Sequence, residues 1–269
     1  MTQMARTRPP AVAGSFYPAS CEELRRVVAE LLAGACHEAH VGVAAPPKAL
    51  IAPHAGYVYS GPIAASAYAR LAASRDVIRR VVLLGPTHFA FVRGLALSSH
   101  DAFATPLGDV PVDHAATSAL TALPFVSVDD RAHAREHCLE VQLPFLQHVL
   151  EEFAVVPALV GEGRPDEVAA ALEALWGGPE TLIVVSSDLS HYEDYATARR
   201  LDATTAARIE RLAAGELDDG CACGCRAIAG LLVAAHRRGL ASSTLDLRNS
   251  GDTAGSRDAV VGYGAWSLA

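Results

Sequence analysis

Three apolar segments of the chain end in the same way, with a histidine shortly after the last apolar residue. They are residues 50–52 before His54, 82–84 before His88 and 183–185 before His191. A single histidine after a strand is most often a solvated or hydrogen-bonded loop residue. Three at equivalent positions favour function, because ligands of open α/β sheets bind beyond the carboxyl ends of the strands. The pattern therefore predicts one cleft that contains all three.

Such a cluster is suited to metal binding, because neutral imidazole is the commonest transition-metal ligand in proteins. Two histidines and one carboxylate with open positions are typical of non-haem Fe(II) and O₂ chemistry. Two histidines with a thiolate or a carboxylate also suit zinc. The spacing leaves the third ligand open, and the candidates are Asp188, Glu136, Glu140 and Asp252.

A second polar cluster, HAREHCLE, covers residues 133–140. It lacks the H-E-x-x-H pattern of zinc proteases. Glu136 and His137 could simply open a helix, where a carboxylate complements the helix dipole. Alternatively, His137 and Glu140 could point into the cleft as acid/base groups or as partners that orient metal ligands. The sequence leaves both interpretations open.

Three further motifs carry weaker signals. Cys221, Cys223 and Cys225 alternate along one segment, but zinc ribbons use C-x₂-C pairs, so we expect these thiols to pack a helix. Residues 186–188, Ser-Ser-Asp, with His191 lack the G-x-S-x-G turn of serine hydrolases. Residues 249–255 form a small polar loop between two apolar strands, either a surface turn or a polar segment held at the end of the sheet.

The elements that must position these residues alternate between apolar runs and helical patterns. Strands are predicted over 49–52, 81–84, 95–98, 110–112, 155–160, 182–186, 245–247 and 260–266. Helices are predicted over 21–34, 61–73, 115–123, 136–153, 166–175, 196–214 and 221–238, the first with a capping box of Ser20 and Glu23. This order predicts an α/β fold with a central, mostly parallel or mixed sheet flanked by helices.

Composition excludes several classes of protein. Of the 269 residues, 51% are hydrophobic and 19% charged, which rules out a disordered chain. A net charge of −8 gives no global attraction for nucleic acid or anionic membranes. The chain has no apolar stretch of transmembrane length and no secretory signal, so we expect a cytoplasmic protein with reduced cysteines. The linker-like stretch 41–48 lies too near the N-terminus to separate large domains, and a single domain over 1–269 is predicted.

Taken together, the motifs resemble the Memo-like family. The resemblance rests on residues 8–18, 53–57, 59–61, 85–88, 105–108, 136–145, 186–192, 222–224 and 249–252, which read RPPAVAGSFYP, PHAGY, YSG, GPTH, TPLG, EHCLEVQLPF, SSDLSHY, ACG and NSGD. These pieces occur in order over nearly the whole chain. The resemblance implies the fold of class III extradiol dioxygenases, which open catechol rings with non-haem Fe(II).

In those enzymes two histidines and a carboxylate hold the metal, and another histidine is the acid/base. By resemblance, His54 and His88 take the metal positions, and His191 takes the catalytic position with Asp188 beside it. Animal family members complete the site with a cysteine from the C-terminal loop. Thr253 is expected at that position here, so the neighbouring Asp252 is the predicted third ligand.

The leading hypothesis is a metal-binding protein with a non-haem-iron, extradiol-dioxygenase-like cleft, an oxidoreductase acting on a small aromatic or diol-type substrate. Fe(II) is the expected metal, with zinc or copper as alternatives. The predicted sites are catalytic His191, Asp188 and His137, substrate-binding Tyr57, Glu140 and Asn249, and metal-binding His54, His88 and Asp252. The alternatives are a metal carrier, or a non-catalytic module that binds a peptide or protein in the same cleft, as animal members resemble adaptors that engage phosphotyrosine peptides. Many bacterial and archaeal members resemble one component of a system with a radical-SAM protein.

Overall fold

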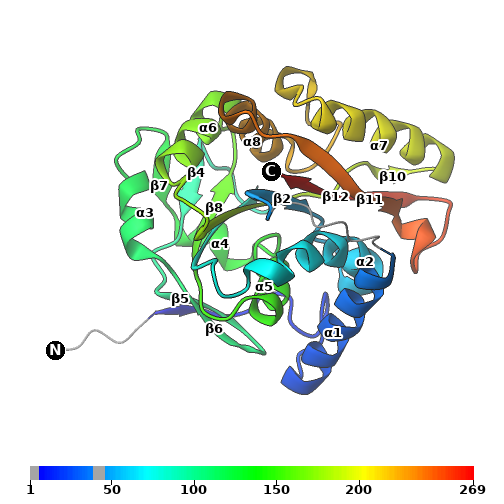
Figure 1. The fold of residues 1–269 in the computed structure, drawn as a ribbon, viewed down its shortest axis with the longest axis horizontal. Helices are drawn as coiled ribbons and strands as arrows, with labels where there is room; N and C mark the ends of the chain where they lie inside the picture. The colour runs from blue at the N-terminus through cyan, green and yellow to red at the C-terminus, as the bar shows by residue number, and fades with distance from the viewer. Residues whose placement is uncertain (1–5, 39–45) are drawn as a thin grey trace.

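A nine-stranded mixed sheet runs through the middle of the computed structural model, which describes residues 6–38 and 46–269 (Figure 1). The strand order is β10-β12-β2-β9-β3-β8-β4-β7, with β11 paired to β12. The strands are β2 (Ala49–Ala52), β3 (Arg80–Pro86), β4 (Leu95–Leu97), β7 (Val126–Val128), β8 (Ala154–Val160), β9 (Thr181–Ser186), β10 (His191–Glu193), β11 (Ser242–Asn249) and β12 (Val260–Leu268). The four central strands β2, β9, β3 and β8 are parallel, so the predicted α/β fold with a mostly parallel sheet is confirmed.

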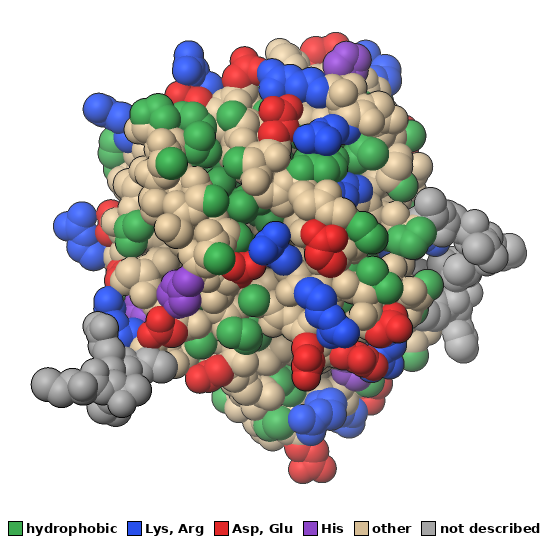
Figure 2. Space-filling model, turned by 60° about the vertical axis from the view of Figure 1, so that its left-hand side comes forward, with side chains coloured by type: hydrophobic (Ala, Val, Ile, Leu, Met, Phe, Trp, Pro, Cys, Tyr) green, Lys and Arg blue, Asp and Glu red, His purple; other side chains and the backbone are tan. Residues whose placement is uncertain are grey.

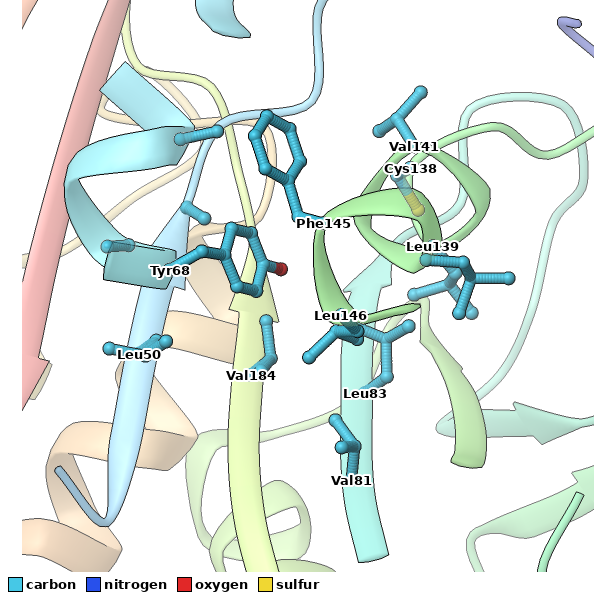
Figure 3. Close-up of a cluster of buried hydrophobic side chains, with 14 of the residues drawn as sticks. Leu50, Tyr68, Val81, Leu83, Cys138, Leu139, Val141, Phe145, Leu146 and Val184 are labelled. Atoms are coloured by element: carbon cyan, nitrogen blue, oxygen red, sulfur yellow. The ribbon is translucent and has the colours of Figure 1, made fainter. Parts of the chain in front are cut away.

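The central strands are mostly apolar and almost entirely buried, as expected of strands that helices cover on both faces. Alternate residues enter two separate cores: Leu50 and Leu83 point to one face, and Ile51 and Leu84 to the other. Figure 3 shows the first core, where Tyr68 lies between strand β2 and the helix that carries Phe145. The covering helices on this face are α1 (Cys21–Glu38), α2 (Tyr57–Tyr68) and α5 (Leu143–Val149), and those on the other are α6 (Pro165–Ala174) and α8 (Cys225–Arg238).

The remaining elements flank the sheet. They are α3 (His114–Leu120), α4 (Asp130–Ala134), α7 (Tyr195–Glu210), the 3₁₀ turns η1 (Ala69–Ser74), η2 (Glu140–Gln142), η3 (Ala214–Glu216) and η4 (Ser250–Asp252), and a small sheet of β1 (Thr7–Arg8), β5 (Ala102–Thr105) and β6 (Gly108–Pro111). The predicted helix over 136–153 is wrong except over Leu143–Val149, the extent of α5. It is an irregular turn followed by η2 and α5, with Pro144 in the first turn of α5, where its missing N–H costs nothing.

The structure also bears on the membrane-protein and nucleic-acid-binding classes that composition argued against. Within the described residues, no helix combines the length and the apolar character needed to cross a bilayer. On the face in Figure 2, Lys and Arg side chains are interspersed with Asp and Glu rather than gathered into one basic patch. Five cysteines are free thiols, while the side chain of Cys36 and most of the predicted linker 41–48 lie outside the described residues.

The order β2-β9-β3 places the carboxyl ends of three parallel strands next to one another. His54 follows β2, His88 follows β3, and Asp188 and His191 follow β9. This edge of the sheet is therefore the place where the candidate residues meet.

Candidate metal centre

His54 is held in one tautomer by the residues behind it. Its ring Nδ1 lies 2.8 Å from Ser186 Oγ at the end of β9. That hydroxyl donates its single proton to the Cys138 carbonyl, at 2.7 Å, and accepts from the side-chain amide of Gln142, at 2.8 Å. Because a carbonyl can only accept, Nδ1 of His54 must be the donor to Ser186. Nε2 of this buried ring therefore keeps its lone pair for a ligand.

His88 is oriented in the same way by a buried carboxylate. Its Nδ1 lies 2.9 Å from Glu136 Oε1, and its backbone N–H donates to Oε2 at 2.7 Å. Burial alone would raise the pKa of Glu136, but the hydrogen bonds and charge of His88, with further backbone N–H groups, outweigh it and hold the pKa at about 2. An ionised carboxylate can only accept, so His88 also carries its proton on Nδ1. A carboxylate behind a histidine is the usual support of a metal-binding imidazole.

Cys223 supplies a thiol at the same point. Its Sγ lies 3.3 Å from His54 Nε2, and one ligand atom each from His54, His88 and Cys223 lie within 4.8 Å of one another. The next residue must be glycine for this approach, because a Cβ at Gly224 would come within 2.7 Å of Ser187 Cβ on the segment after β9. The Gly224 N–H donates to Ser187 Oγ at 2.9 Å and fixes the contact.

These donors fit a transition metal. Two imidazoles and a thiol suit zinc, copper or iron and are a poor match for Mg²⁺ or Ca²⁺, which prefer oxygen ligands. Burial, together with the nearby Asp188 carboxylate, raises the pKa of Cys223 to about 12, so the thiol is protonated without a cation and a bound metal would displace its proton. The ring centroids of His54 and His88 lie 5.2 Å apart.

A second group, His88, Glu136 and Cys138, is also compact enough to hold a metal. The Glu136 carboxylate is already engaged, since it accepts from both N–H groups of His88 and from the backbone N–H groups of His137 and Cys138, at 2.9 and 3.1 Å. Cys138 Sγ is directed at the Pro86 carbonyl, 3.2 Å away. This group therefore orients His88, and the Glu136 oxygens and the Cys138 thiol are already engaged in hydrogen bonds.

The donors His54 and His88 open into a cavity of about 690 Å³, within the roughly 300–1,000 Å³ usual for small-molecule sites. His137, Asp188 and His191 line the same cavity, so the structure brings together five of the residues that the sequence singled out. The His137 ring lies 4.9 Å from His88 and 5.5 Å from His54. Asp188 accepts from the His54 backbone N–H at 2.7 Å, and burial raises its pKa.

Asp252, the predicted third metal ligand, lies outside this group. Its carboxylate accepts from the Tyr195 hydroxyl at 2.6 Å and from the backbone N–H of Asn249, the N-cap of the turn η4, at 3.1 Å. The third donor beside His54 and His88 is Cys223, which the sequence analysis assigned to helix packing. The signal that could have found it is the Ala222-Cys-Gly224 piece of the family resemblance.

The residues predicted to bind substrate also lie elsewhere. The Tyr57 hydroxyl donates to the Val141 carbonyl at 2.7 Å, and the Asn249 side chain accepts from Gly251 N–H. Glu140 is fully buried and binds Arg8, 2.5 Å away. The aromatic cavity wall comes instead from Phe16, Tyr59, Tyr192 and Tyr263. Phe16, whose ring centroid lies 4.8 Å from that of His137, belongs to the N-terminal segment 8–18, which has no helical or strand period and whose signal is the family resemblance alone.

Comparison with known proteins decides the family. The family model described as "Memo-like protein" matches residues 8–267. The chain belongs to the Memo-like family. MEMO1 family proteins of Aquifex aeolicus and Methanopyrus kandleri are 37% and 38% identical to it, each covering 96% of this chain and 97% of the relative. An uncharacterized Escherichia coli K12 protein shares the fold at 15% identity, with a TM-score of 0.50 over 80% of this chain and 98% of that one.

In this Memo-like protein we expect Glu136→Gln to weaken metal binding about 10–100-fold, the usual cost of removing a partner that orients a metal ligand. A glutamine can place its NH₂ toward His88 Nδ1 and disfavours the tautomer that leaves Nε2 free. Anaerobic titration with Zn(II) against a chromophoric chelator measures the change.

Asp252→Asn is the comparison variant for this titration. Because the Asp252 carboxylate is engaged by Tyr195, Asn249 and Arg257 rather than by the three donors, we expect parental affinity. A large loss in Asp252→Asn with none in Glu136→Gln would reverse the assignment of the site.

Proposed function

We propose that the 690 Å³ cavity is a metal-dependent active site that uses non-haem iron to oxidise a small aromatic or diol-type substrate. The observation that carries the proposal is the convergence of the Nε2 atom of His54, a ring nitrogen of His88 and the Cys223 thiol beside this cavity. Two further imidazoles, His137 and His191, line the cavity without being needed as donors. A metal carrier has no use for spare acid/base groups.

In this proposal His54, His88 and Cys223 hold the metal, which when bound supplies a Lewis acid and a one-electron centre for O₂. His191 is exposed on β10 at the cavity wall, so it can exchange protons with solvent and with a substrate hydroxyl. Asp188, held through the His54 N–H, places a carboxylate in the same wall.

The aromatic lining of the cavity suits a planar ligand. Phe16, Tyr59, Tyr192 and Tyr263 offer flat aromatic surfaces, which favour stacked or edge-on contacts with another ring. Tyr192 has a φ of 60°, a left-handed conformation that is costly for a bulky residue and is common near functional sites. Its side chain is 78% exposed at the cavity.

We expect His191→Ala to keep bound iron and to lower turnover about 10²–10⁴-fold, the usual contribution of an acid/base group. The test is anaerobic reconstitution with Fe(II), followed by oxygen uptake across a panel of catechols and hydroxy-aromatic compounds. Metal content is measured on the same samples, so that loss of iron is separated from loss of proton transfer.

The same experiment distinguishes the rival functions. Exposed Val58, Tyr59 and Tyr192 at the cavity favour a peptide-binding module as the second candidate. Stoichiometric iron with no oxygen uptake on any compound of the panel would contradict the oxidase proposal and leave a carrier or a binding module. A cytoplasmic location and a radical-SAM companion remain predictions from the sequence.

A further inference from the structure

A second, smaller cavity of about 240 Å³ also reaches the metal centre. Its wall includes Cys223 and Thr87, but neither His54 nor His88, whereas the wall of the large cavity includes both histidines and not Cys223. Cys223 is partly exposed and forms part of the wall of the second cavity. The three donors therefore lie between two separate cavities.

An ion-pair cluster borders this second cavity. Arg226 on α8 binds Glu162 at 2.8 Å and Asp219 at 3.2 Å. The same three residues also line a third cavity, of about 300 Å³, to which Asp218 and Cys225 contribute. Arg226 is thus part of the wall that the second and third cavities share.

The charges of these two cavities favour a cation. Three carboxylates, Glu162, Asp218 and Asp219, line them, against the two guanidinium groups of Arg226 and Arg164. Arg164 is engaged with Glu167, 3.0 Å away on its own helix. A concave surface with excess negative charge raises the local concentration of cations. The 240 Å³ volume is below that of most organic-ligand pockets and leaves room for an ion with bound waters.

We propose that the second and third cavities form the path by which the metal cation reaches Cys223, with Arg226 as the gate. The inference rests on the proposed function, because it requires a metal at His54, His88 and Cys223. Arg226 is partly exposed and both of its partners are exposed, and ion pairs of this kind are weak enough to open readily. Metal can then enter or leave while the large cavity holds an organic ligand.

The test compares Arg226→Ala with the parent in anaerobic stopped-flow uptake of Co(II), followed by release into excess chelator. We expect both rate constants to rise by similar factors, on the order of 10-fold, which corresponds to removing the need to break two exposed ion pairs. A gate changes the barriers to uptake and to release equally and leaves the Kd unchanged. A change in the metal donors would alter the ratio of the release rate constant to the uptake rate constant, which is the Kd.

Arg237→Ala is a matched control. Arg237 lies on the same helix and also joins two carboxylates, Asp166 and Glu173, at 2.7 and 3.1 Å, but it lines neither cavity. We expect parental rates in this variant. Equal rates in Arg226→Ala and Arg237→Ala would overturn the proposed path.

Val58→Trp tests the competing entrance, because Val58 is an exposed residue of the large cavity. We expect no change in Co(II) uptake. Slower uptake in Val58→Trp, with parental rates in Arg226→Ala, would show that the cation enters through the large cavity. If the parent binds no Co(II) at equilibrium, the proposed function fails before any rate is compared, so the two failures are distinguishable.

Discussion

Replacing Cys223 by serine is expected to weaken metal binding by roughly 1,000-fold or more, beyond the 10–100-fold typical of residues that only orient a ligand. The substitution keeps the size of the side chain and removes the one donor that can become an anion within the group of His54, His88 and Cys223. Two neutral imidazoles alone leave the charge of a divalent ion uncompensated. Anaerobic Zn(II) titration against a chromophoric chelator gives the Kd of each protein.

Cys221→Ser is the matched control for this prediction. Cys221 is a buried cysteine two residues away, whose Sγ contacts Arg208 and Asp218 at 3.0 and 3.3 Å. We expect it to bind Zn(II) as the parent does. An equal loss in both variants would mean that the segment before α8 has been disturbed, and parental affinity in Cys223→Ser would remove the thiol from the site.

The second large effect concerns Glu140, whose replacement by glutamine is expected to lower the free energy of unfolding by about 3–5 kcal/mol. Its buried carboxylate accepts from the Arg8 guanidinium and the Tyr17 hydroxyl, each at 2.5 Å, and from the Ala11 and Val12 N–H groups at 2.7 and 3.0 Å. The variant leaves the Arg8 charge buried without its counter-ion. Urea unfolding followed by circular dichroism measures the difference.

Glu30→Gln carries the same chemical change on the surface. Glu30 pairs with Arg26 one helical turn away, and both side chains are about 60% exposed. Such pairs contribute about 0.3–0.5 kcal/mol, so we expect little change. If the urea midpoint of Glu140→Gln equals that of the parent, the buried hydrogen bonds of Glu140 do not stabilise the packing of the N-terminal segment, contrary to the structure.

Much of the site could be predicted because it follows from the central strands. Short apolar runs rich in Val, Leu and Ile predicted β2, β3, β8 and β9, and parallel neighbours bring the residues after their carboxyl ends together. That argument alone placed His54, His88 and His191 at one edge. The order that places β2, β9 and β3 side by side was not itself predicted and comes from the structure.

The third donor could not be derived in the same way. Cys223 precedes α8, and its direction depends on the close approach of Gly224 to Ser187, a contact between residues far apart in the sequence. Local spacing could not decide which of three alternating thiols faces the histidines. Asp252 was predicted as the donor because it lies in the family's C-terminal loop next to Thr253, but its carboxylate is used to bond the Asn249 backbone at the start of η4.

Glu140 shows a second limit of sequence reasoning. In the predicted helix it shared a polar segment with His137, but the structure turns this segment before η2 and directs Glu140 away from the cavity toward Arg8. The N-terminal segment that receives it has no hydrophobic period. Only its tertiary contacts, such as Tyr57 N–H to the Phe16 carbonyl at 2.8 Å, show that it forms part of the cavity wall.

The most direct test of the metal centre is the absorption spectrum of the protein titrated anaerobically with Co(II). We expect a thiolate-to-cobalt charge-transfer band that saturates at one equivalent in the parent and in Cys221→Ser, and that is absent in Cys223→Ser. A band of equal strength in Cys223→Ser, or no band in the parent, would contradict a site built from His54, His88 and Cys223.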